Sequence, residues 1–353
     1  MLDKIKKNYL LMVKNYDKKH KSDHWNKFLN QSNLGKNKID NLENFRKPKI
    51  FGNSLTHGLS DDFGFIPTMN LLVNLLKLKS NIDFNEYSEV RIGNPNFYDF
   101  DGVLTNYNEL RTIKLLINLE KYISENSKII CEIGGGFGSL ASKIKKRYPN
   151  KTIILIDIPE TLILQSYYLS SVFPEYKFCF YEEFISLSAE NLNKNSYDFI
   201  IIPPWAINKI IGNISIDLFI NSHSFQEMDR EVIIEYFNFI QKTIKVEGTF
   251  YNLNKNFKLI NNKAIKISEY PYDDKWKILK KKIDSGNPNM HEVVTQRIKN
   301  KNIQFLEEIR KIPQTNPSLR KISLIKIIFR KILDCIMLFV PKKILFKLMK
   351  IYL

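Results

Sequence analysis

The segment Glu132-Ile-Gly-Gly-Gly-Phe-Gly138 combines an acidic residue with closely spaced glycines. Glycines in a turn let backbone N–H groups and the positive end of a following helix approach a polar ligand closely. The apolar run 128–133 precedes this turn, and Leu140, Ile144 and Tyr148 follow it at the four-residue spacing of a helix face. The order of strand, glycine turn and helix predicts a ligand-binding loop.

The residues around this turn indicate which ligand it binds. Gly134, Gly136 and Gly138 give the spacing G-x-G-x-G, whereas the dinucleotide fingerprint needs glycine or alanine where Ser139 stands. Glu132 occupies a position that is usually apolar in dehydrogenases. A carboxylate there suits a sulfonium or ammonium cation better than a pyrophosphate. The charge pattern therefore favours S-adenosylmethionine (SAM) over NAD.

A second acidic residue completes the predicted cofactor site. Asp157 closes the buried strand predicted over 152–156, where its carboxylate is placed to accept hydrogen bonds from both ribose hydroxyls, and Pro159 then starts a helix. An acid at this position serves either cofactor. The expected cofactor-binding residues are Glu132, Gly134, Gly135, Gly136, Gly138, Asp157 and Ile158.

The rest of the chain predicts an α/β fold with a doubly wound, mostly parallel sheet. Further strands are expected over 177–181, 197–202, 216–220 and 249–253, with helices over 108–123 and 230–244. We expect a helical, loop-rich N-terminal cap over 1–105 and a Rossmann-like domain over 106–285. A linker near 287, another near 313–318, and basic amphipathic helices are expected to fill residues 286–353.

Three further segments, taken with the glycine loop, resemble the bacterial sugar O-methyltransferase family over about residues 85–300. They are Ile92-Gly-Asn-Pro95, Ile158-Pro-Glu-Thr161 and Ile220-Asn-Ser-His-Ser-Phe-Gln-Glu-Met228. The resemblance implies a class I, SAM-dependent methyltransferase that methylates a sugar hydroxyl during the assembly of a surface polysaccharide. The acceptor that it implies is a sugar or glycan, either free, nucleotide-linked or lipid-linked.

Methyl transfer to an alcohol needs a base that removes the hydroxyl proton as the new bond forms. Two candidates follow the strand predicted over 216–220, at the sheet edge where this fold places acceptors. His223 has the better unperturbed pKa for this task, while Glu227 lies in the Gln-Glu-Met element that the resemblance picks out. We favour Glu227 and keep His223; Glu227 as a cap of the next helix is the structural alternative.

Other polar and aromatic residues are candidate acceptor contacts: Asn221, Trp205, Tyr98 and Tyr107. A tryptophan at a sheet edge can stack on a sugar face, although a core tryptophan explains the residue equally well. His20 and His24 have the i, i+4 spacing of helical metal ligands, but no third ligand is evident. We therefore expect no metal.

The net charge of +17 is concentrated at the two ends of the chain. Residues 1–50 hold 13 lysines and arginines against 5 acids, and residues 319–353 hold 9 against 1, which leaves +1 for residues 51–318. A nucleic-acid enzyme is expected to carry a basic stripe beside its site. The nearly neutral middle of the chain therefore argues against a nucleic-acid partner.

Residues 319–353 show an apolar pattern at three- and four-residue steps among lysines and arginines. Such a stretch lies on an anionic membrane surface, or packs on the core or on a second subunit in a homo-oligomer. Three separated cysteines and apolar runs too short to span a bilayer indicate a cytoplasmic protein, with peripheral contact at the inner membrane face as one interpretation. The rival functions are an NAD(P)-dependent sugar oxidoreductase and a non-catalytic SAM-fold module that binds glycan-assembly machinery.

Overall fold

The computed structural model describes residues 1–20, 25–26, 39–46, 73, 76–77, 80–88, 90–95, 97–100, 102–188, 191, 197–260, 263–284 and 287–312. The basic stretch 319–353, the linker expected at 313–318, His24 and most of the segment around Met69–Leu78 lie outside these residues. Within the described part of the chain, no helix is both long and apolar enough to cross a bilayer.

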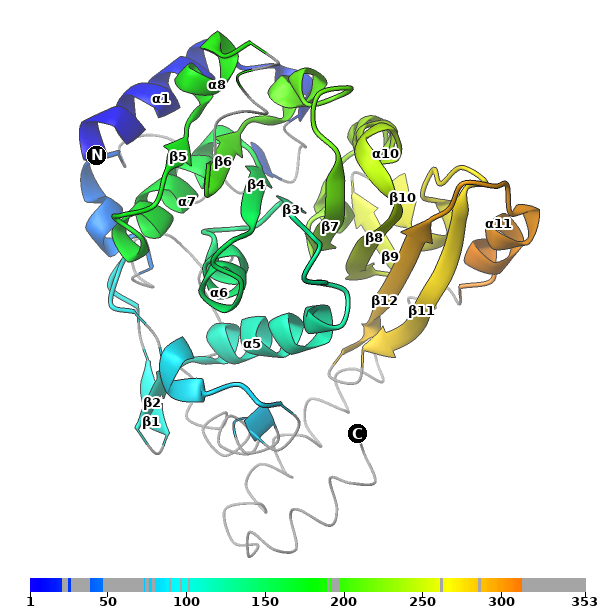
Figure 1. Ribbon diagram of the computed structural model, residues 1–353, viewed down its shortest axis with the longest axis horizontal. Coiled ribbons are helices and arrows are strands. Elements are labelled where there is room, and N and C mark those ends of the chain that lie inside the picture. Colours follow the sequence, from blue (N-terminus) through cyan, green and yellow to red (C-terminus); the bar gives the residue numbers. More distant parts are fainter. Residues whose placement is uncertain are drawn as a thin grey trace, which may run out of the picture.

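An eight-stranded sheet forms the centre of the molecule, in the order β11-β12-β8-β7-β3-β4-β6-β5 (Figure 1). The strands from β5 to β8 along this order are parallel, and β12 and β11 are antiparallel. Their bounds are β3 Ile129–Ile133, β4 Thr152–Ile156, β5 Phe178–Cys179, β6 Phe199–Ile202, β7 Ile216–Ser222, β8 Ile244–Lys255, β11 Trp276–Asp284 and β12 Asn287–Arg297. This arrangement confirms the predicted mostly parallel α/β sheet.

The central strands consist largely of isoleucine because helices cover both faces of a parallel sheet and leave no face for polar side chains. Residues 130–133 of β3, 153–156 of β4 and 199–202 of β6 are all buried. Helices connect successive strands: α5 (Tyr107–Glu120) precedes β3, α6 (Ser139–Arg147) and α7 (Pro159–Val172) flank β4, and α10 (Arg230–Thr243) joins β7 to β8.

The direction of winding reverses between β3 and β7. The connection through α6 leads from β3 to β4, and the connection through α10 leads from β7 to β8, so the chain moves toward opposite edges of the sheet. Right-handed crossovers then place α6 and α10 on opposite faces. Ligands of open α/β sheets bind at such a reversal, beyond the carboxyl ends of the strands. The glycine loop leaves β3 at this point.

The N-terminal region adds helices and turns around this domain. Helix α1 (Leu2–Lys14) packs against α7 and α8 (Tyr181–Ser186) at one end of the molecule (Figure 1). The remaining elements before α5 are short: η1 Lys18–His20, η3 Ile39–Asn44, η5 Phe84–Tyr87 and the hairpin of β1 (Tyr98–Phe100) with β2 (Val103–Thr105). After β8 come the hairpin of β9 (Phe257–Ile260) with β10 (Lys263–Lys266), η8 (Ile267–Glu269) and α11 (Ile303–Arg310).

The prediction of a linker near residue 287 was wrong. Residues 287–297 form β12, which pairs with β8 and β11, so the sheet continues past the expected domain boundary at 285. Pro288 suggested a turn, yet proline is tolerated at the start of a strand. The residues that follow it, Val293 to Thr295, are β-branched and buried, and their burial outweighs the local turn signal.

Candidate active site

The glycine loop begins where β3 ends and turns back across the end of β4. The Gly134 N–H donates to the carbonyl oxygen of Ile156, at 2.9 Å, which fixes the start of the loop to the neighbouring strand. Gly136 has φ +60°, and no atom lies within 4 Å of the position that a Cβ would occupy there. A left-handed backbone beside open space is what a loop needs if a ligand is to lie against its backbone.

The Asn-Ser-His-Ser segment packs directly on this loop. A Cβ on Gly134 would lie 1.9 Å from the Ser224 hydroxyl oxygen, so a larger residue at 134 is incompatible with Ser224 in its present place. The two motifs that the sequence places about ninety residues apart therefore touch at the reversal between β3 and β7. This contact was not part of the sequence prediction.

Asn221 holds the ends of β3 and β7 together. Its amide nitrogen donates to the Ile133 carbonyl at 2.9 Å, and its amide oxygen accepts from the Phe225 N–H at 3.1 Å and from Asn254 at 2.8 Å. The side chain is fully buried. The structure therefore gives Asn221 a role in shaping the site, while its predicted contact with an acceptor stays a prediction.

Glu132 and Asp157 are two carboxylic acids at the ends of adjacent strands; Glu132 is buried and Asp157 is partly buried. Burial raises the pKa of Glu132 to about 8, and the carboxylate of Asp157 adds to this shift. Burial likewise raises the pKa of Asp157 to about 7, against hydrogen bonds from Thr161 and the Ile158 N–H. One Glu132 oxygen, Oε2, is buried without a hydrogen-bond partner. An orphaned carboxylate oxygen beside a glycine loop fits a cationic or hydroxyl-bearing ligand, because a buried acceptor without a partner is costly.

Gln165, on α7, is a further residue of this site that the sequence did not reveal. Its amide nitrogen donates to the Gly136 carbonyl at 2.9 Å and to the Asp157 carboxylate at 3.0 Å. It thereby ties the glycine loop to the acid that follows β4. Ile158 is buried and its N–H donates to Asp157 at 2.8 Å. The eight-residue interval from Asp157 to Gln165, about two helical turns, is a weak signal that could have pointed to this pair.

His223 is held in a specific protonation state. Arg111 of α5 lies 2.6 Å from Nε2, and Ser222 lies 2.8 Å from Nδ1. A guanidinium can only donate, so Nε2 accepts and Nδ1–H donates to the Ser222 hydroxyl. Burial, together with the charge of Arg111, lowers the pKa of His223 to about 3. In this arrangement the lone pair that a general base needs is already engaged.

Glu227 lies in η7 (Phe225–Glu227), the short turn between β7 and α10. Its carboxylate is 3.6 Å from the Lys258 ammonium, and about a quarter of its side chain is exposed (27%). The N-cap of α10 is Asp229, so Glu227 is not the residue at that cap position. Its role as the base therefore stays a prediction.

The predicted aromatic contacts lie in three different elements. Trp205, in η6 (Pro204–Lys209), is half-buried, makes edge-to-face contacts with Tyr16 and Tyr181, and donates from its indole to Tyr181 at 3.2 Å. Tyr98 is half-buried in the β1–β2 hairpin, and Tyr107 is the first residue of α5. The contacts of these residues with an acceptor therefore stay predictions.

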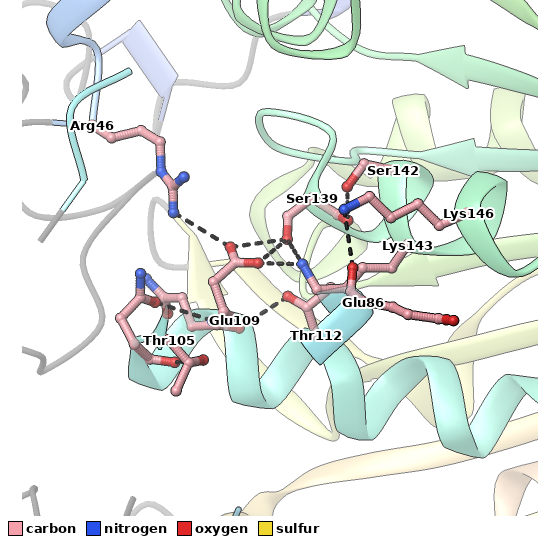
Figure 2. Close-up of polar contacts among 11 residues, drawn as sticks. Arg46, Glu86, Thr105, Glu109, Thr112, Ser139, Ser142, Lys143 and Lys146 are labelled. Atoms are coloured by element: carbon pink, nitrogen blue, oxygen red, sulfur yellow. Dashed lines mark hydrogen bonds and ion pairs between the residues drawn. The ribbon is translucent and has the colours of Figure 1, made fainter. Parts of the chain in front are cut away.

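A buried charged network lies on the α5 side of the loop (Figure 2). Glu109 contacts Arg46 at 3.4 Å, accepts from the Ser139 hydroxyl at 3.0 Å, and forms an ion pair with Lys143. Ser139 is the first residue of α6, directly after the last glycine. The lysine and arginine charges hold the pKa of the Glu109 carboxyl below its usual range despite its burial. The sequence offered no sign of this network because its members are far apart along the chain.

Comparison with known proteins agrees with this geometry. Residues 94–180, about a quarter of the chain, match the family model of the O-methyltransferase domain. A cephaeline 6'-O-methyltransferase of Carapichea ipecacuanha is 36% identical over 63 residues, which are 18% of this chain and 18% of that protein. The chain therefore spans under a fifth of the length of this curated relative.

Solved structures with a similar fold include three methyltransferases. An O-methyltransferase family protein from Burkholderia thailandensis has a TM-score of 0.37 and 11% identity, over 55% of this chain and 59% of that one. Mitomycin 7-O-methyltransferase has a TM-score of 0.35 and 11% identity, over 73% and 80%. Human N-acetylserotonin methyltransferase, solved with SAM, has a TM-score of 0.30 and 14% identity, over 54% and 56%.

The sheet order, the glycine loop and the matched segment together define the class of protein. The fold is the Rossmann-like α/β fold of class I methyltransferases. The segment that matches the O-methyltransferase domain model includes the glycine loop. This arrangement fits SAM, the cofactor predicted from Glu132 and Ser139. SAM supplies an electrophilic methyl group when bound, and Glu132, Asp157 and the glycine backbone are the residues that would hold it.

Proposed function

We propose that this chain is a SAM-dependent O-methyltransferase that methylates a sugar hydroxyl, as a step in the assembly of a bacterial surface polysaccharide. The observation that carries the methyltransferase part is the pair of acids with raised pKa at adjacent strand ends, Glu132 and Asp157, beside a loop that the O-methyltransferase family model matches. The sugar acceptor rests on the motif resemblance in the sequence, above all on the segment 220–228.

The chemistry requires an acceptor hydroxyl in line with the methyl donor and a base beside it. The segment after β7 is the strongest candidate for the acceptor side because Ser224 packs against Gly134 of the cofactor loop. Within this segment Glu227 is the better base. His223 donates or accepts through both ring nitrogens to Arg111 and Ser222, and its lowered pKa makes proton uptake unfavourable near neutral pH.

A binding measurement separates this function from the rival oxidoreductase. Isothermal titration of the full chain with S-adenosylhomocysteine (SAH) is expected to show saturable binding, and titration with NADH is expected to show none. Binding of NADH alone would favour the sugar oxidoreductase instead. Mass spectrometry of surface glycans from a deletion strain then tests the acceptor: loss of a methyl mass supports a sugar, and unchanged glycans argue against it.

Substitution of Glu227 tests the proposed base. Glu227→Gln should lower kcat by roughly 10²- to 10⁴-fold, the usual contribution of a general base, while the Kd for SAH stays unchanged. Glu231→Gln is the matched control, because Glu231 is an exposed acid in the first turn of α10. If Glu227→Gln retains the kcat of the unaltered chain on the true acceptor, then Glu227 is not the base. Equal losses in both variants would lead to the same conclusion.

A further inference from the structure

We propose that Glu109 is a positioning residue that couples the binding of the cofactor to the docking of an N-terminal segment, residues 39–46, on the cofactor loop. We call residues 39–46 the strap; it comprises η3 (Ile39–Asn44) with Phe45 and Arg46. The inference rests on the proposed function in one respect only, namely that the glycine loop binds SAM.

The strap touches the glycine loop itself. The Phe45 ring packs edge-to-face on the ring of Phe137, which lies between Gly136 and Gly138, with 5.6 Å between centroids. The Arg46 guanidinium lies over the same ring, 4.6 Å from its centroid. The strap therefore contacts the Phe137 ring through both Phe45 and Arg46. A movement of Phe137 within the loop changes these contacts.

The strap is also anchored away from the loop. The Arg46 N–H donates to the Gly93 carbonyl at 2.8 Å, and the Asn94 amide donates to the Asn44 side chain at 3.0 Å. A Cβ on Gly93 would lie 2.3 Å from the Phe45 ring, so this turn accepts the ring only because residue 93 is glycine. The turn around residues 93–94, part of the Ile92–Pro95 motif, is therefore the surface on which the strap packs.

Glu109 joins the strap to the helix that follows the loop. One oxygen of its carboxylate faces Arg46, and both accept from Ser139, while Lys143 one turn further along α6 also pairs with it (Figure 2). Asn106 fixes the backbone of Glu109 by accepting its N–H at 3.1 Å. The side chains of Arg46 and Glu109 are 3% and 1% exposed. Charged hydrogen bonds of this kind hold their partners in a fixed geometry. The positions of the strap and of Ser139 are therefore linked through the Glu109 carboxylate.

The charges of the network explain why Arg46 is the informative residue to change. Lys143 alone is sufficient to compensate the Glu109 carboxylate, so removal of the Arg46 charge leaves no buried acid without a cation. Removal of the Glu109 charge, in contrast, leaves two buried cations without their acid, which is strongly unfavourable. Arg46→Met should therefore fold, and it removes the charged connection between the strap and Glu109 while the contact of Phe45 with Phe137 stays in place.

The experiment measures SAH affinity and amide hydrogen exchange in the full chain. In the unaltered protein, SAH should slow exchange in residues 39–46. Arg46→Met should raise the Kd for SAH by about tenfold, within the usual range for coupled sites, and should clearly reduce the SAH-dependent change in the strap. Glu109→Gln should show the same loss if it folds. The thermal midpoint of Arg46→Met should change little, since a purely structural role would lower it without removing ligand-dependent protection.

The chain offers a matched control in a second ion pair between the same two helices. Arg147 of α6 pairs with Glu120 of α5 at 2.9 Å, away from the strap and the loop. Arg147→Met should leave the Kd and the exchange pattern unchanged. An unchanged Kd and exchange difference in Arg46→Met would overturn the inference, as would an equal loss in Arg147→Met. Failure of the unaltered chain to bind SAH would instead refute the assigned cofactor and, with it, the proposed function.

Discussion

Gly134 and Ser224 are the residues at which the cofactor side and the proposed acceptor side of the site meet. The Ser224 hydroxymethyl group fills the space that a side chain at position 134 would need. Gly134 also has φ +75°, a conformation that costs a residue with a Cβ about 1–2 kcal/mol. Position 134 is therefore restricted to glycine for two separate reasons, one of backbone conformation and one of packing.

Gly134→Ala should abolish measurable SAH binding and lower stability by more than the conformational cost alone. Gly102→Ala is the matched control, because Gly102 has φ +84° but no atom within 4 Å of its Cβ position. Calorimetry and SAH titration would compare the two. The packing explanation further predicts that Ser224→Gly in the Gly134→Ala background partly restores binding; no recovery in the double variant would contradict it.

The raised pKa values of Glu132 and Asp157 predict opposite effects of pH on stability and on binding. The pKa values of about 8 for Glu132 and about 7 for Asp157 lie above their ordinary values of 4.5 and 3.8. The folded state therefore binds these protons more tightly than the unfolded state. The resulting contribution to stability is complete below the ordinary values and is lost as the pH rises through 7 and 8.

We expect the thermal midpoint of the ligand-free protein to fall between pH 5 and pH 8.5. Over the same range SAH should bind more tightly, by up to about tenfold per pH unit for each of the two carboxylates, because their ionised forms are its partners. Scanning calorimetry and titration at several pH values would measure both. The double variant Glu132→Gln, Asp157→Asn should flatten the stability profile; a profile as steep as that of the unaltered protein would assign the protons to other groups.

At the scale of elements, the site depends on the N-terminal part of α5, which contacts residues that follow β3 and β7. Helix α5 contributes Glu109 to the network behind the glycine loop and Arg111 to His223 after β7. One helix thus contacts the segments on both sides of the winding reversal. His223 itself has φ +65°, so its backbone conformation turns the chain sharply as it leaves β7.

Arg111→Met should raise the pKa of His223, because the guanidinium charge is one of the causes of its lowered value. The histidine should still titrate below its ordinary pKa of 6.5, since burial is the larger cause. NMR titration of ring resonances would measure this, and the five histidines of the chain make assignment by single substitutions practical. A pKa that is unchanged in Arg111→Met would show that the contact does not influence the ring.

At the scale of the whole molecule, the net charge is unevenly distributed along the sequence. Most of the net charge of +17 falls in residues 1–50 and 319–353. The second of these stretches lies outside the described residues, so its role stays a proposal: peripheral contact with an anionic membrane, or packing on this protein or on a second copy. Contact with a membrane would suit an enzyme whose acceptor is lipid-linked.

Flotation with liposomes tests this membrane proposal. The full chain should float with vesicles that contain anionic lipid, and binding should weaken at high salt, because each basic residue near the surface contributes about 1 kcal/mol. A variant that lacks residues 319–353 should not float, while its affinity for SAH should be unchanged. Equal flotation of both forms would remove the basis for the membrane interpretation.

The sequence by itself determined those features that depend on local order along the chain. The strand before Gly134, the helix after Gly138 and the acid after the strand 152–156 are neighbours in sequence, so hydrophobic periodicity and turn chemistry were enough to predict them. The parallel α/β fold followed from the alternation of such units, and the cofactor followed from the charge of Glu132.

Only the tertiary structure decided which distant residues complete the site. The contact of Ser224 with Gly134, the pairing of Arg111 with His223 and the network of Glu109 with Arg46 and Lys143 join segments that are about 30 to more than 100 residues apart. No local pattern marks such pairs, because their energies arise from burial and charge compensation after the elements have packed. Tertiary packing also explains why residues 287–297 form β12 and not the predicted linker. Pairing with β8 and burial of Val293 and Val294 outweigh the turn signal at Pro288.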